Sequence, residues 1–510
     1  MAKVIGIDLG TTMSAMAYVD EIGRPVMIPN AEGQNITPSV VKFGKNDQVV
    51  IGQTAKNAAV AQPKNVVQFI KRYMSNPDYL TKPDDNGTEH RPEEISALIL
   101  KNLKQDAEKA LGEVVTKAVI TVPAYFGDLE RQRTKQAGKI AGFEVLDIIN
   151  EPTAAAIAYG IKQAQENMTI LVYDLGGGTF DVTVLRVVGG GELKVLATEG
   201  NKSLGGTDFD EAICKFFAEQ FKAAHQIDPL ENLRTYQDFR NKAEVAKIGL
   251  SKDVEIDIDL TAGGEVLDIK LTREQVENLI TPDIDQTQVL TEKVLEAAAL
   301  KWGNVDKVLL VGGSTRIPLV QKMVKSLTGK EPETGINPDE VVAMGAAIYA
   351  AGLGGIAVRG AGGKAIAALK VRNVTAHSLG IIAKNDASED INSKLIQKNS
   401  EIPAEGQGIF TTFEDNQTEA RIQIVQGEDE NPEYCTKVGD AGVLKGIPPK
   451  PKGTAKIQVR LGYDKSGMVR LHAKELESGV ELVANIENHA LLSEEEMRKV
   501  TAKVAGLRVT

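Results

Sequence analysis

Two stretches of the chain place an aspartate, a leucine and glycines directly after an apolar run. Residues 4–14 read VIGIDLGTTMS and residues 171–184 read LVYDLGGGTFDVTV. Glycines permit a tight turn whose backbone N–H groups can approach phosphate oxygens closely, and Asp8 and Asp174 supply carboxylates at the ends of the apolar runs. Two such turns that face each other could hold a polyphosphate with a cation between them.

A hairpin turn is the alternative interpretation of either Asp-Leu-Gly. The repetition of the pattern along the chain favours the phosphate-binding interpretation and indicates two related halves. A third glycine-rich turn at residues 311–316, VGGSTR, again follows an apolar run and precedes a helical pattern, as a nucleotide-contacting loop does.

The elements that must position these turns are visible in the apolar periodicity. Short β-branched runs alternate with longer helical patterns over residues 1–351, which predicts an α/β domain on a largely parallel sheet. Residues 119–122, 170–173 and 308–311 are apolar without alternation, as is typical of strands covered on both faces. The segment 352–363 has six glycines in twelve residues and is the best boundary in the chain.

The periodicity changes after that boundary. Residues 457–461 and 480–486 alternate apolar and polar side chains, which predicts half-buried antiparallel strands. Ser493 and Glu496 form a capping-box pattern, and the apolar residues that follow at helical spacing predict a short terminal helix.

Composition limits the class of protein. The chain has 510 residues, which at about 150 per domain suggests roughly three domains, and its 42% hydrophobic and 25% charged residues fit a soluble globular protein. The formal charge of −11 is not clustered, so nucleic acid and membrane surfaces are not expected partners. Two distant cysteines and the absence of a signal-peptide or spanning pattern predict a cytoplasmic protein.

The motifs together resemble those of the seventy-kilodalton heat-shock chaperone family, the DnaK type in particular. The stretches that carry the resemblance occur in family order: IGIDLGTT at 5–12, VPAYFGDLERQ at 122–132, INEPTAAAIAYG at 149–160, DLGGGTFDV at 174–182, GGSTRIP at 312–318 and INPDE at 336–340. The resemblance implies an actin-like α/β ATPase with two lobes, followed by an all-β peptide-binding sandwich and a short C-terminal helix. It divides the chain into residues 1–351, a linker 352–373, the sandwich 374–492 and a truncated lid 493–510.

The resemblance also implies roles for individual residues, with ATP or ADP and Mg²⁺ as cofactors. Asp8 and Asp174 would hold Mg²⁺ largely through water, and Lys71 would place positive charge beside the γ-phosphate. Glu151 and Asp181 would position the attacking water or the hydration shell of the metal, and Thr179 completes the catalytic set. The residues expected to contact nucleotide are Gly10, Thr11, Thr12, Gly176, Gly177, Gly178, Gly205, Gly206, Glu244, Lys247, Ser251, Gly312, Gly313, Ser314, Arg316 and Asp339.

For the base and ribose side, spacing gives independent but weak support. Glu244, Lys247 and Ser251 recur at i, i+3 and i+7, so one helix face presents all three, although a solvated helix face is the alternative. Ile248 stands where relatives often carry arginine or another side chain against the adenine. We therefore do not expect a side chain at this position to stack on the base as it does in those relatives.

The second half of the resemblance predicts a site for extended hydrophobic peptides, such as segments of unfolded proteins. Its expected contacts are Phe410, Phe413, Ala420, Ile422 and Met468. Sandwich core is the alternative for Phe410 and Ile422. Ala420 replaces a larger residue and predicts a deeper pocket, and Lys384 opposite Phe413 is less apolar than expected.

Communication between the two domains depends, in this family, on the linker that joins them. The linker 369–373, LKVRN, carries charged residues where the family has leucines, and Asn373 stands where the family has an acidic residue. Docking of this linker on the ATPase domain by apolar burial would therefore be weaker. Asp147 stands where relatives have a basic residue, while the expected relay residues Pro123 and Arg131 are present. The preferred function is an ATP-driven chaperone with a J-domain co-chaperone and an exchange factor as partners. The alternatives are a scaffold or regulator with weak or uncoupled ATPase activity and, least favoured, a small-molecule kinase.

Overall fold

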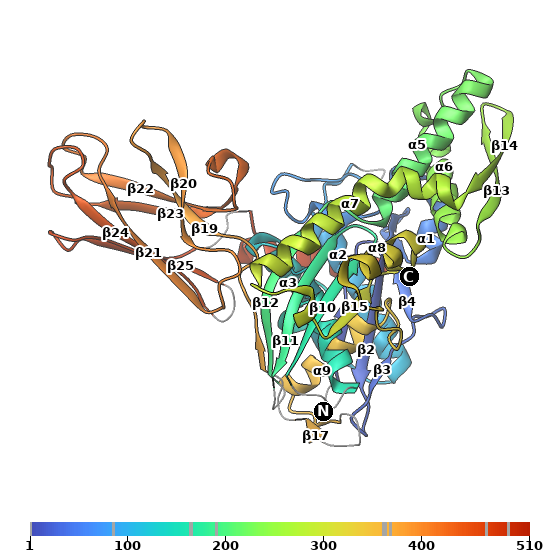
Figure 1. Cartoon of the computed structure of the whole chain (residues 1–510), viewed down its shortest axis with the longest axis horizontal. Coiled ribbons are helices and arrows are strands. Elements are labelled where there is room, and N and C mark those ends of the chain that lie inside the picture. The colour runs from blue at the N-terminus through green and yellow to red at the C-terminus, as the bar shows by residue number, and fades with distance from the viewer. Residues whose placement is uncertain are drawn as a thin grey trace.

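The chain was analysed as a computed structural model, which describes residues 3–83, 87–162, 167–188, 192–359, 365–366, 370–464, 468–486 and 490–510. Residues 3–353, the N-terminal portion, are built on two mixed β-sheets, and a β-sandwich extends from one side (Figure 1). The first sheet has the order β3-β2-β1-β8-β9, with β4 paired to β2. Its strands are β1 (Lys3–Asp8), β2 (Met13–Val19), β3 (Pro25–Met27), β4 (Ile36–Pro38), β8 (Val115–Val122) and β9 (Glu144–Asn150).

The second sheet repeats the central arrangement of the first. Its order is β15-β10-β11-β12-β18. Its strands are β10 (Met168–Leu175), β11 (Phe180–Val188), β12 (Glu192–Asn201), β15 (Lys307–Val311) and β18 (Lys370–Arg372). The apolar runs at 119–122, 170–173 and 308–311 lie within β8, β10 and β15 and are buried, as predicted.

Each Asp-Leu-Gly turn joins two antiparallel strands. Strand β1 returns as β2 and β10 returns as β11, because a turn of a few residues can only reverse the chain, whereas parallel neighbours need a longer crossover. The β1–β8, β8–β9, β10–β15 and β12–β18 pairs are parallel. The expectation of largely parallel sheets is therefore wrong, and both sheets are mixed.

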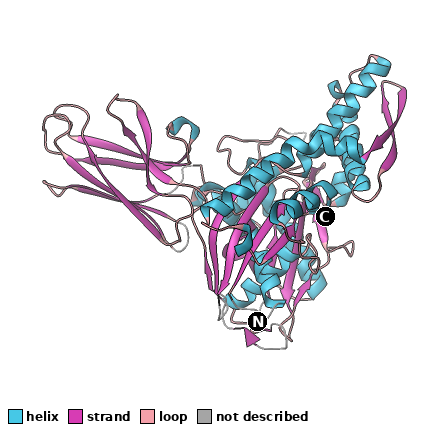
Figure 2. Ribbon diagram, in the orientation of Figure 1, coloured by secondary structure: helices cyan, strands magenta, loops and turns pink. Residues whose placement is uncertain are grey.

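Helices cover the faces of both sheets (Figure 2). The α-helices of the N-terminal portion are α1 (Gln53–Ala58), α2 (Pro92–Leu111), α3 (Asp128–Ile140), α4 (Glu151–Lys162), α5 (Gly206–His225), α6 (Leu233–Leu250), α7 (Arg273–Ala297), α8 (Pro318–Thr328) and α9 (Val341–Leu353). Helices α4 and α9 pack against each other, α4 on β10 and α9 on β1, so their buried side chains join the two sheets in one core.

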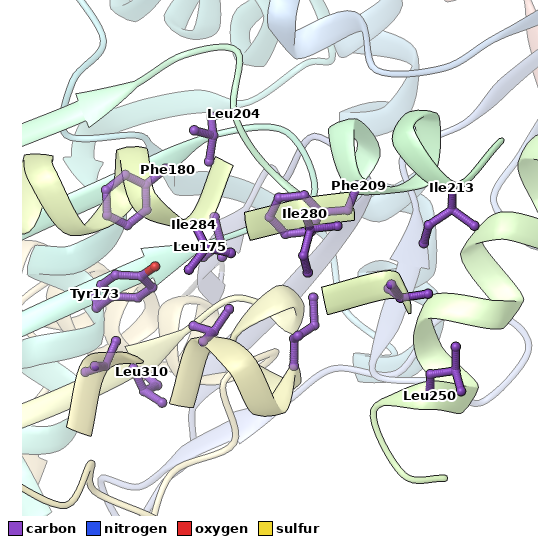
Figure 3. Packing of buried hydrophobic residues seen from close by; sticks show 14 of the residues in the cluster. Tyr173, Leu175, Phe180, Leu204, Phe209, Ile213, Leu250, Ile280, Ile284 and Leu310 are labelled. Carbon is purple, nitrogen blue, oxygen red and sulfur yellow. The ribbon is translucent and has the colours of Figure 1, made fainter. Parts of the chain in front are cut away.

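The largest core lies in the second half of the N-terminal portion (Figure 3). Phe180 and Phe209 are fully buried there, and the hydroxyl of Tyr173 donates to Oγ1 of Thr287 at 2.7 Å. This bond satisfies a polar group that would otherwise be costly to bury. The core thus fixes β10 and β11, the strands that flank the second glycine turn.

Smaller elements complete the N-terminal portion. A sheet of order β27-β6-β5-β7 contains β5 (Val41–Phe43), β6 (Gln48–Ile51), β7 (Val66–Val67) and β27 (Arg508–Val509). Two hairpins are β13 (Glu255–Ala262) with β14 (Glu265–Thr272) and β16 (Val358–Arg359) with β17 (Ala365–Ile366). The 3₁₀ helices are η1 (Pro63–Asn65), η2 (Ile70–Tyr73), η3 (Pro229–Glu231), η4 (Trp302–Asn304), η5 (Gly313–Arg316) and η7 (Pro432–Tyr434), the last in the sandwich.

The sandwich consists of two four-stranded antiparallel sheets with one shared core. One sheet has the order β20-β19-β22-β23, from β19 (Leu379–Lys384), β20 (Asp390–Ile396), β22 (Glu419–Gln426) and β23 (Thr436–Lys445). The other has the order β21-β24-β25-β26, from β21 (Ala404–Thr411), β24 (Lys456–Tyr463), β25 (Val469–Glu475) and β26 (Glu481–Asn485). The alternating residues at 457–461 and 481–485 lie in β24 and β26, as predicted.

The C-terminal helix α10 (Glu494–Gly506) has the predicted capping box between Ser493 and Glu496. It packs on α2 and α3 of the N-terminal portion, where Leu492, Val504 and Val509 are buried in the core of the first half. Strand β27 then pairs in parallel with β6. The end of the chain is thus part of the N-terminal portion.

Across the described ranges, no helix combines the length and apolar character that crossing a membrane would require.

Candidate functional site

A cleft of about 610 Å³ lies between the two halves of the N-terminal portion and is lined by both Asp-Leu-Gly turns. The third glycine-rich turn, which begins η5, lines it as well. The predicted residues that line the cleft are Asp8, Gly10, Thr11, Thr12, Lys71, Glu151, Asp174, Gly176, Gly177, Thr179, Gly206, Glu244, Lys247, Ser251, Gly312, Gly313, Ser314, Arg316 and Asp339. Residues from distant parts of the sequence therefore converge on one cavity.

The first two turns meet where glycines of the second turn contact threonines of the first. A Cβ atom on Gly177 would lie 2.3 Å from Cγ2 and Oγ1 of Thr12, and one on Gly178 would lie 2.3 Å from Cγ2 of Thr11. Any side chain there would force the turns apart. Glycine is therefore required for the two hairpins to approach this closely. Each Asp-Leu-Gly is both a hairpin turn and a lining segment of the cleft, so the two interpretations of the sequence do not exclude each other.

Four carboxylates and one ammonium group gather near these turns. The Nζ atom of Lys71, on η2, lies 2.6 Å from Oε1 of Glu151, the first residue of α4, and both side chains are buried. Asp174 on β10 stands opposite Asp181 on β11, and both are buried. Asp8 ends β1 and accepts a hydrogen bond from the hydroxyl of Thr121 at 3.0 Å.

The negative charge of this group is strongly disfavoured without a counterion. Burial, with Glu151 as the next cause, raises the pKa of Asp8 and of Asp181 to about 7 each. Burial and the neighbouring carboxylates also raise the pKa of Asp174 well above its usual value. One lysine does not balance four acids, and a bound divalent cation would restore their charged forms.

The arrangement of the carboxylates suits a cation that is bound mostly through water. Among the described residues, no three His, Cys, Asp or Glu side chains converge as direct metal ligands. Mg²⁺ usually keeps several waters and binds through one or two carboxylates together with substrate phosphates. Asp8 and Asp174 fit that mode, because both border a cavity with room for phosphate.

The opposite wall of the cleft comes from α6 and η5. Glu244 forms an ion pair with Lys56 of α1 at 2.6 Å, which links the two halves across the cleft. Lys247 pairs with buried Asp210 at 2.6 Å and donates to the carbonyl of Gly206 at 2.8 Å. The exposed Ile248 also borders the cavity. The helix face that spacing predicted is therefore turned toward the cleft.

On the η5 side, Arg316 pairs with Asp339 at 2.6 Å. The hydroxyl of Ser314 donates to the carbonyl of Gly176 at 2.9 Å, which ties the third turn to the second. A Cβ on Gly312, whose φ is +82°, would lie 2.4 Å from the carbonyl oxygen of Leu175. The third turn can pack here only because residue 312 is glycine.

Three of the predicted site residues stand behind the cleft wall. Gly178 and Gly205 contact the other glycine turns, and the carboxylate of Asp181 accepts a hydrogen bond from the backbone N–H of Tyr125 at 2.9 Å. Thr207 and Asp210, which line the cavity from α5, were not predicted. Thr207 directly follows the glycine pair at 205–206 and Asp210 lies one helical turn further on, and that proximity was the available signal.

The predicted peptide-contacting residues divide into two groups in the sandwich. Phe413 and Met468 are 46% and 38% exposed, whereas Ile422 is buried and Phe410 and Ala420 pack against the core. The Nζ atom of Lys384 lies 5.9 Å from the centre of the Phe413 ring, within range of a cation–π contact. The lysine thus contacts the aromatic ring opposite it.

The linker is docked through its backbone and its charges. Residues 370–372 form β18, which extends the second sheet along β12, and Arg372 lies 2.5 Å from Glu192 and 3.0 Å from Glu401. Val371 packs on the core. Residues 360–364 and 367–369 of the predicted linker lie outside the described residues. The charged linker, for which we expected weaker docking by apolar burial, is docked by strand pairing and ion pairs instead.

Three of the four predicted interdomain residues, Arg131, Asp147 and Asn373, line a second cavity of about 570 Å³ beside β18, and Pro123 does not. Arg131 donates to Oδ1 of Asn150 at 2.5 Å, and Asp147 accepts a hydrogen bond from the hydroxyl of Tyr349 at 2.8 Å. Asn373 lines the cavity, and its Oδ1 is buried without a hydrogen-bond partner among the residues that the structure describes. Pro123 immediately follows β8 and leads into Tyr125.

Comparisons with known proteins agree with this geometry. The family model described as Hsp70 protein matches residues 4–79 and 75–507. The chaperone protein DnaK of Thermosipho africanus is 45% identical over 503 residues, which cover 98% of this chain and 82% of that protein. Those of Thermotoga neapolitana and Thermotoga maritima are 45% and 44% identical over 504 residues, with the same coverage.

Proposed function

The chain belongs to the Hsp70 family and is an ATP-dependent chaperone with ATPase activity, and on that premise we propose how its residues divide the work. We propose that MgATP binds and is hydrolysed in the cleft between the halves of the N-terminal portion. The observation that carries this proposal is the group of four carboxylates around Lys71 beside the two glycine turns. A Cβ atom on Gly177 or Gly178 would collide with the first of these turns.

The residues of the cleft would have separate roles. Backbone N–H groups and hydroxyls of residues 10–12 and 176–179 would bind phosphate oxygens, and Asp8 and Asp174 would hold Mg²⁺ mostly through water. Mg²⁺ held there would supply positive charge that neutralises the phosphate oxygens. Lys71 adds positive charge beside the same group, and the Lys71–Glu151 contact fixes both side chains.

Water attack on the γ-phosphate requires a group that orients the water and accepts its proton. Burial and the neighbouring Glu151 carboxylate raise the pKa of Asp181, and Lys71 lowers it, so the three groups lie close together. We propose that they orient the attacking water and that its proton passes to a carboxylate or to phosphate oxygen. Glu244, Lys247, Ser251, Arg316 and Asp339 would bind the base and ribose.

We propose further that the N-terminal portion is an actin-like ATPase with two lobes, one around each sheet. The repeated hairpins and the cleft between them support this assignment. The proposed division is residues 1–351, linker 352–373, sandwich 374–492 and terminal segment 493–510. Location in the cytoplasm, a J-domain co-chaperone and an exchange factor remain predictions from the family.

The sandwich would bind extended hydrophobic segments of unfolded polypeptides. The exposed side chains of Phe413 and Met468 support a contact surface, and Phe410, Ala420 and Ile422 would form its floor. The contact of Lys384 with Phe413 would have to open or shift when peptide enters. Ala420 leaves space for a larger peptide side chain than valine would.

Single-turnover ATP hydrolysis, with and without a saturating extended hydrophobic peptide, tests the proposal. Acceleration by peptide is expected, because the docked linker joins the sandwich to β12 of the ATPase. Hydrolysis that peptide does not change would instead support a regulator with an uncoupled ATPase. No hydrolysis would refute the roles given to Lys71 and Glu151.

A further inference from the structure

His377 lies at the contact between the sandwich and the N-terminal portion, between the linker and β19. It is 9% exposed. Its Nε2 atom lies 3.1 Å from the carbonyl oxygen of Tyr125, and the two rings meet edge to face with centres 4.3 Å apart. A carbonyl oxygen can only accept a hydrogen bond, so Nε2 carries the proton.

Tyr125 connects this contact to the cleft. Its backbone N–H donates to Oδ1 of Asp181 at 2.9 Å, so one residue binds His377 on one side and a proposed water-orienting carboxylate on the other. A second sandwich residue holds the same tyrosine. The Nζ atom of Lys398 lies 4.7 Å from the centre of its ring and 2.7 Å from Glu199 of β12.

The surroundings of His377 do not favour a positive charge. Burial, followed by Lys202, Lys398 and Arg131, lowers its pKa to about 3. The nearby carboxylates already have other partners: Glu199 pairs with Lys398, Glu130 with Lys202, and Glu428 accepts hydrogen bonds from Ser378. Protonation of the docked imidazole would therefore add a positive charge that no neighbour within the described part of the chain balances.

We propose that His377 is a positioning residue for ATP hydrolysis: its neutral imidazole holds the carbonyl of Tyr125, the residue whose N–H holds Asp181, and acidification releases the sandwich from this contact. This inference rests on the role proposed for Asp181. The sandwich thereby senses pH at the point where it contacts the catalytic region.

The sign and size of the effect follow from linkage. A histidine that returns to an ordinary pKa of about 6.5 on undocking takes up a proton below that pH, so docking is strongest above 6.5 and weakens as pH falls toward 3. Between pH 7.5 and 5.5 the docking equilibrium should fall about tenfold from this group alone.

Asp128 at the same interface acts in the opposite direction. Its N–H lies 3.4 Å from Oε1 of Gln426 on the sandwich, and burial raises its pKa to about 6. If undocking exposes it, the docked state binds its proton more tightly, and acidification strengthens docking. The His377 effect is therefore measured as the ratio between the parent chain and a His377 variant at each pH, which cancels the Asp128 contribution.

Hydrogen exchange of the Thr198 amide reports docking directly. This N–H, on β12, donates to Oδ1 of Asn399 in the sandwich at 3.0 Å, so undocking removes its partner. The full chain is compared with His377→Gln, whose amide can still donate without charging, with His377→Leu, and with His472→Gln. The last is a matched control, since His472 is half-buried on β25 and pairs with Glu481.

The expected result is that, relative to pH 7.5, the parent chain and His472→Gln lose about tenfold more Thr198 protection at pH 5.5 than both His377 variants. Single-turnover hydrolysis should show the same difference in pH profile. Identical protection profiles for parent and His377→Gln would overturn the proposal. A difference in protection without one in hydrolysis would overturn the positioning role, whereas wild-type hydrolysis by Asp181→Asn would refute the Asp181 assignment itself.

Discussion

Replacement of Gly177 by alanine tests the contact between the two glycine turns. The added Cβ would lie 2.3 Å from Cγ2 and Oγ1 of Thr12, far inside normal contact distance. The φ of Gly177 does not lie in the left-handed region, so alanine is compatible with the backbone there and the steric contact alone is tested.

The magnitude follows from overpacking in a closely packed site, which costs typically about 1–3 kcal/mol. One factor of ten in a rate or equilibrium constant corresponds to about 1.4 kcal/mol, so nucleotide affinity or turnover should fall about 5- to 150-fold. Thr12→Ser removes Cγ2 and frees the hydroxyl to rotate, so the double variant should recover part of the loss. Such recovery would appear as a coupling energy in a double-mutant cycle.

The assays are ADP binding by calorimetry and single-turnover hydrolysis. Gly335→Ala is the matched control, because no atom of the described residues lies within 4 Å of its added Cβ. Gly177→Ala with parent-like affinity and turnover would refute the claim that the turns require glycine to meet. Equal losses in the single and double variants would refute Thr12 as the colliding side chain.

Three further predictions concern catalysis, docking and the chain end. Glu151→Gln should slow single-turnover hydrolysis about 10²- to 10⁴-fold while ADP still binds; an unchanged rate would exclude Glu151 as a water-orienting group. In the Asp128→Asn variant the sandwich should dock more tightly than in the parent chain at pH 7.5 but not near pH 4. Docking raises the pKa of Asp128 from 3.8 to about 6, so the protonated carboxyl favours docking fully below pH 3.8, and this contribution is lost as pH rises through about 6. Thr198 exchange measures this difference, and a constant difference across pH would contradict it. Val504→Ala removes two buried carbons and about 1.5 kcal/mol of burial free energy that holds α10. Hydrogen exchange of the Ile51 amide, which donates to the carbonyl of Thr510, should therefore become about tenfold faster. Lys499→Ala, at an exposed position, should have no effect, and equal exchange in the two variants would contradict the prediction.

The sequence predicted the cleft residues well because glycine turns after buried strands leave a strong local pattern. The repeat of Asp-Leu-Gly indicated that Asp8 and Asp174 would face one cavity, as they do. The same pattern did not predict mixed sheets, since apolar runs indicate burial on both faces but carry no information on strand direction. The direction of β2 and β11 depends on the length of the turn before each.

Contacts between distant segments were beyond sequence reasoning. No motif surrounds His377, and only the fold brings it to Tyr125. The charges of the linker suggested weaker docking because the partners of Arg372, Glu192 and Glu401, lie far away in sequence. Asp210 was missed for a similar reason: its role depends on Lys247 of another helix.

The docked linker strand and the terminal strand have a joint consequence for the sandwich. Strand β18 fastens one end of it to the second sheet, and α10 with β27 fastens the other end to the first half. The sandwich is therefore attached to the N-terminal portion at both of its ends, and release of β18 alone leaves it attached through α10 and β27. Redocking is then intramolecular, at an effective concentration that short tethers set near millimolar, so a weak interface suffices to bring it back. Extended linkers or a freed chain end should lower that effective concentration without touching a single interface residue.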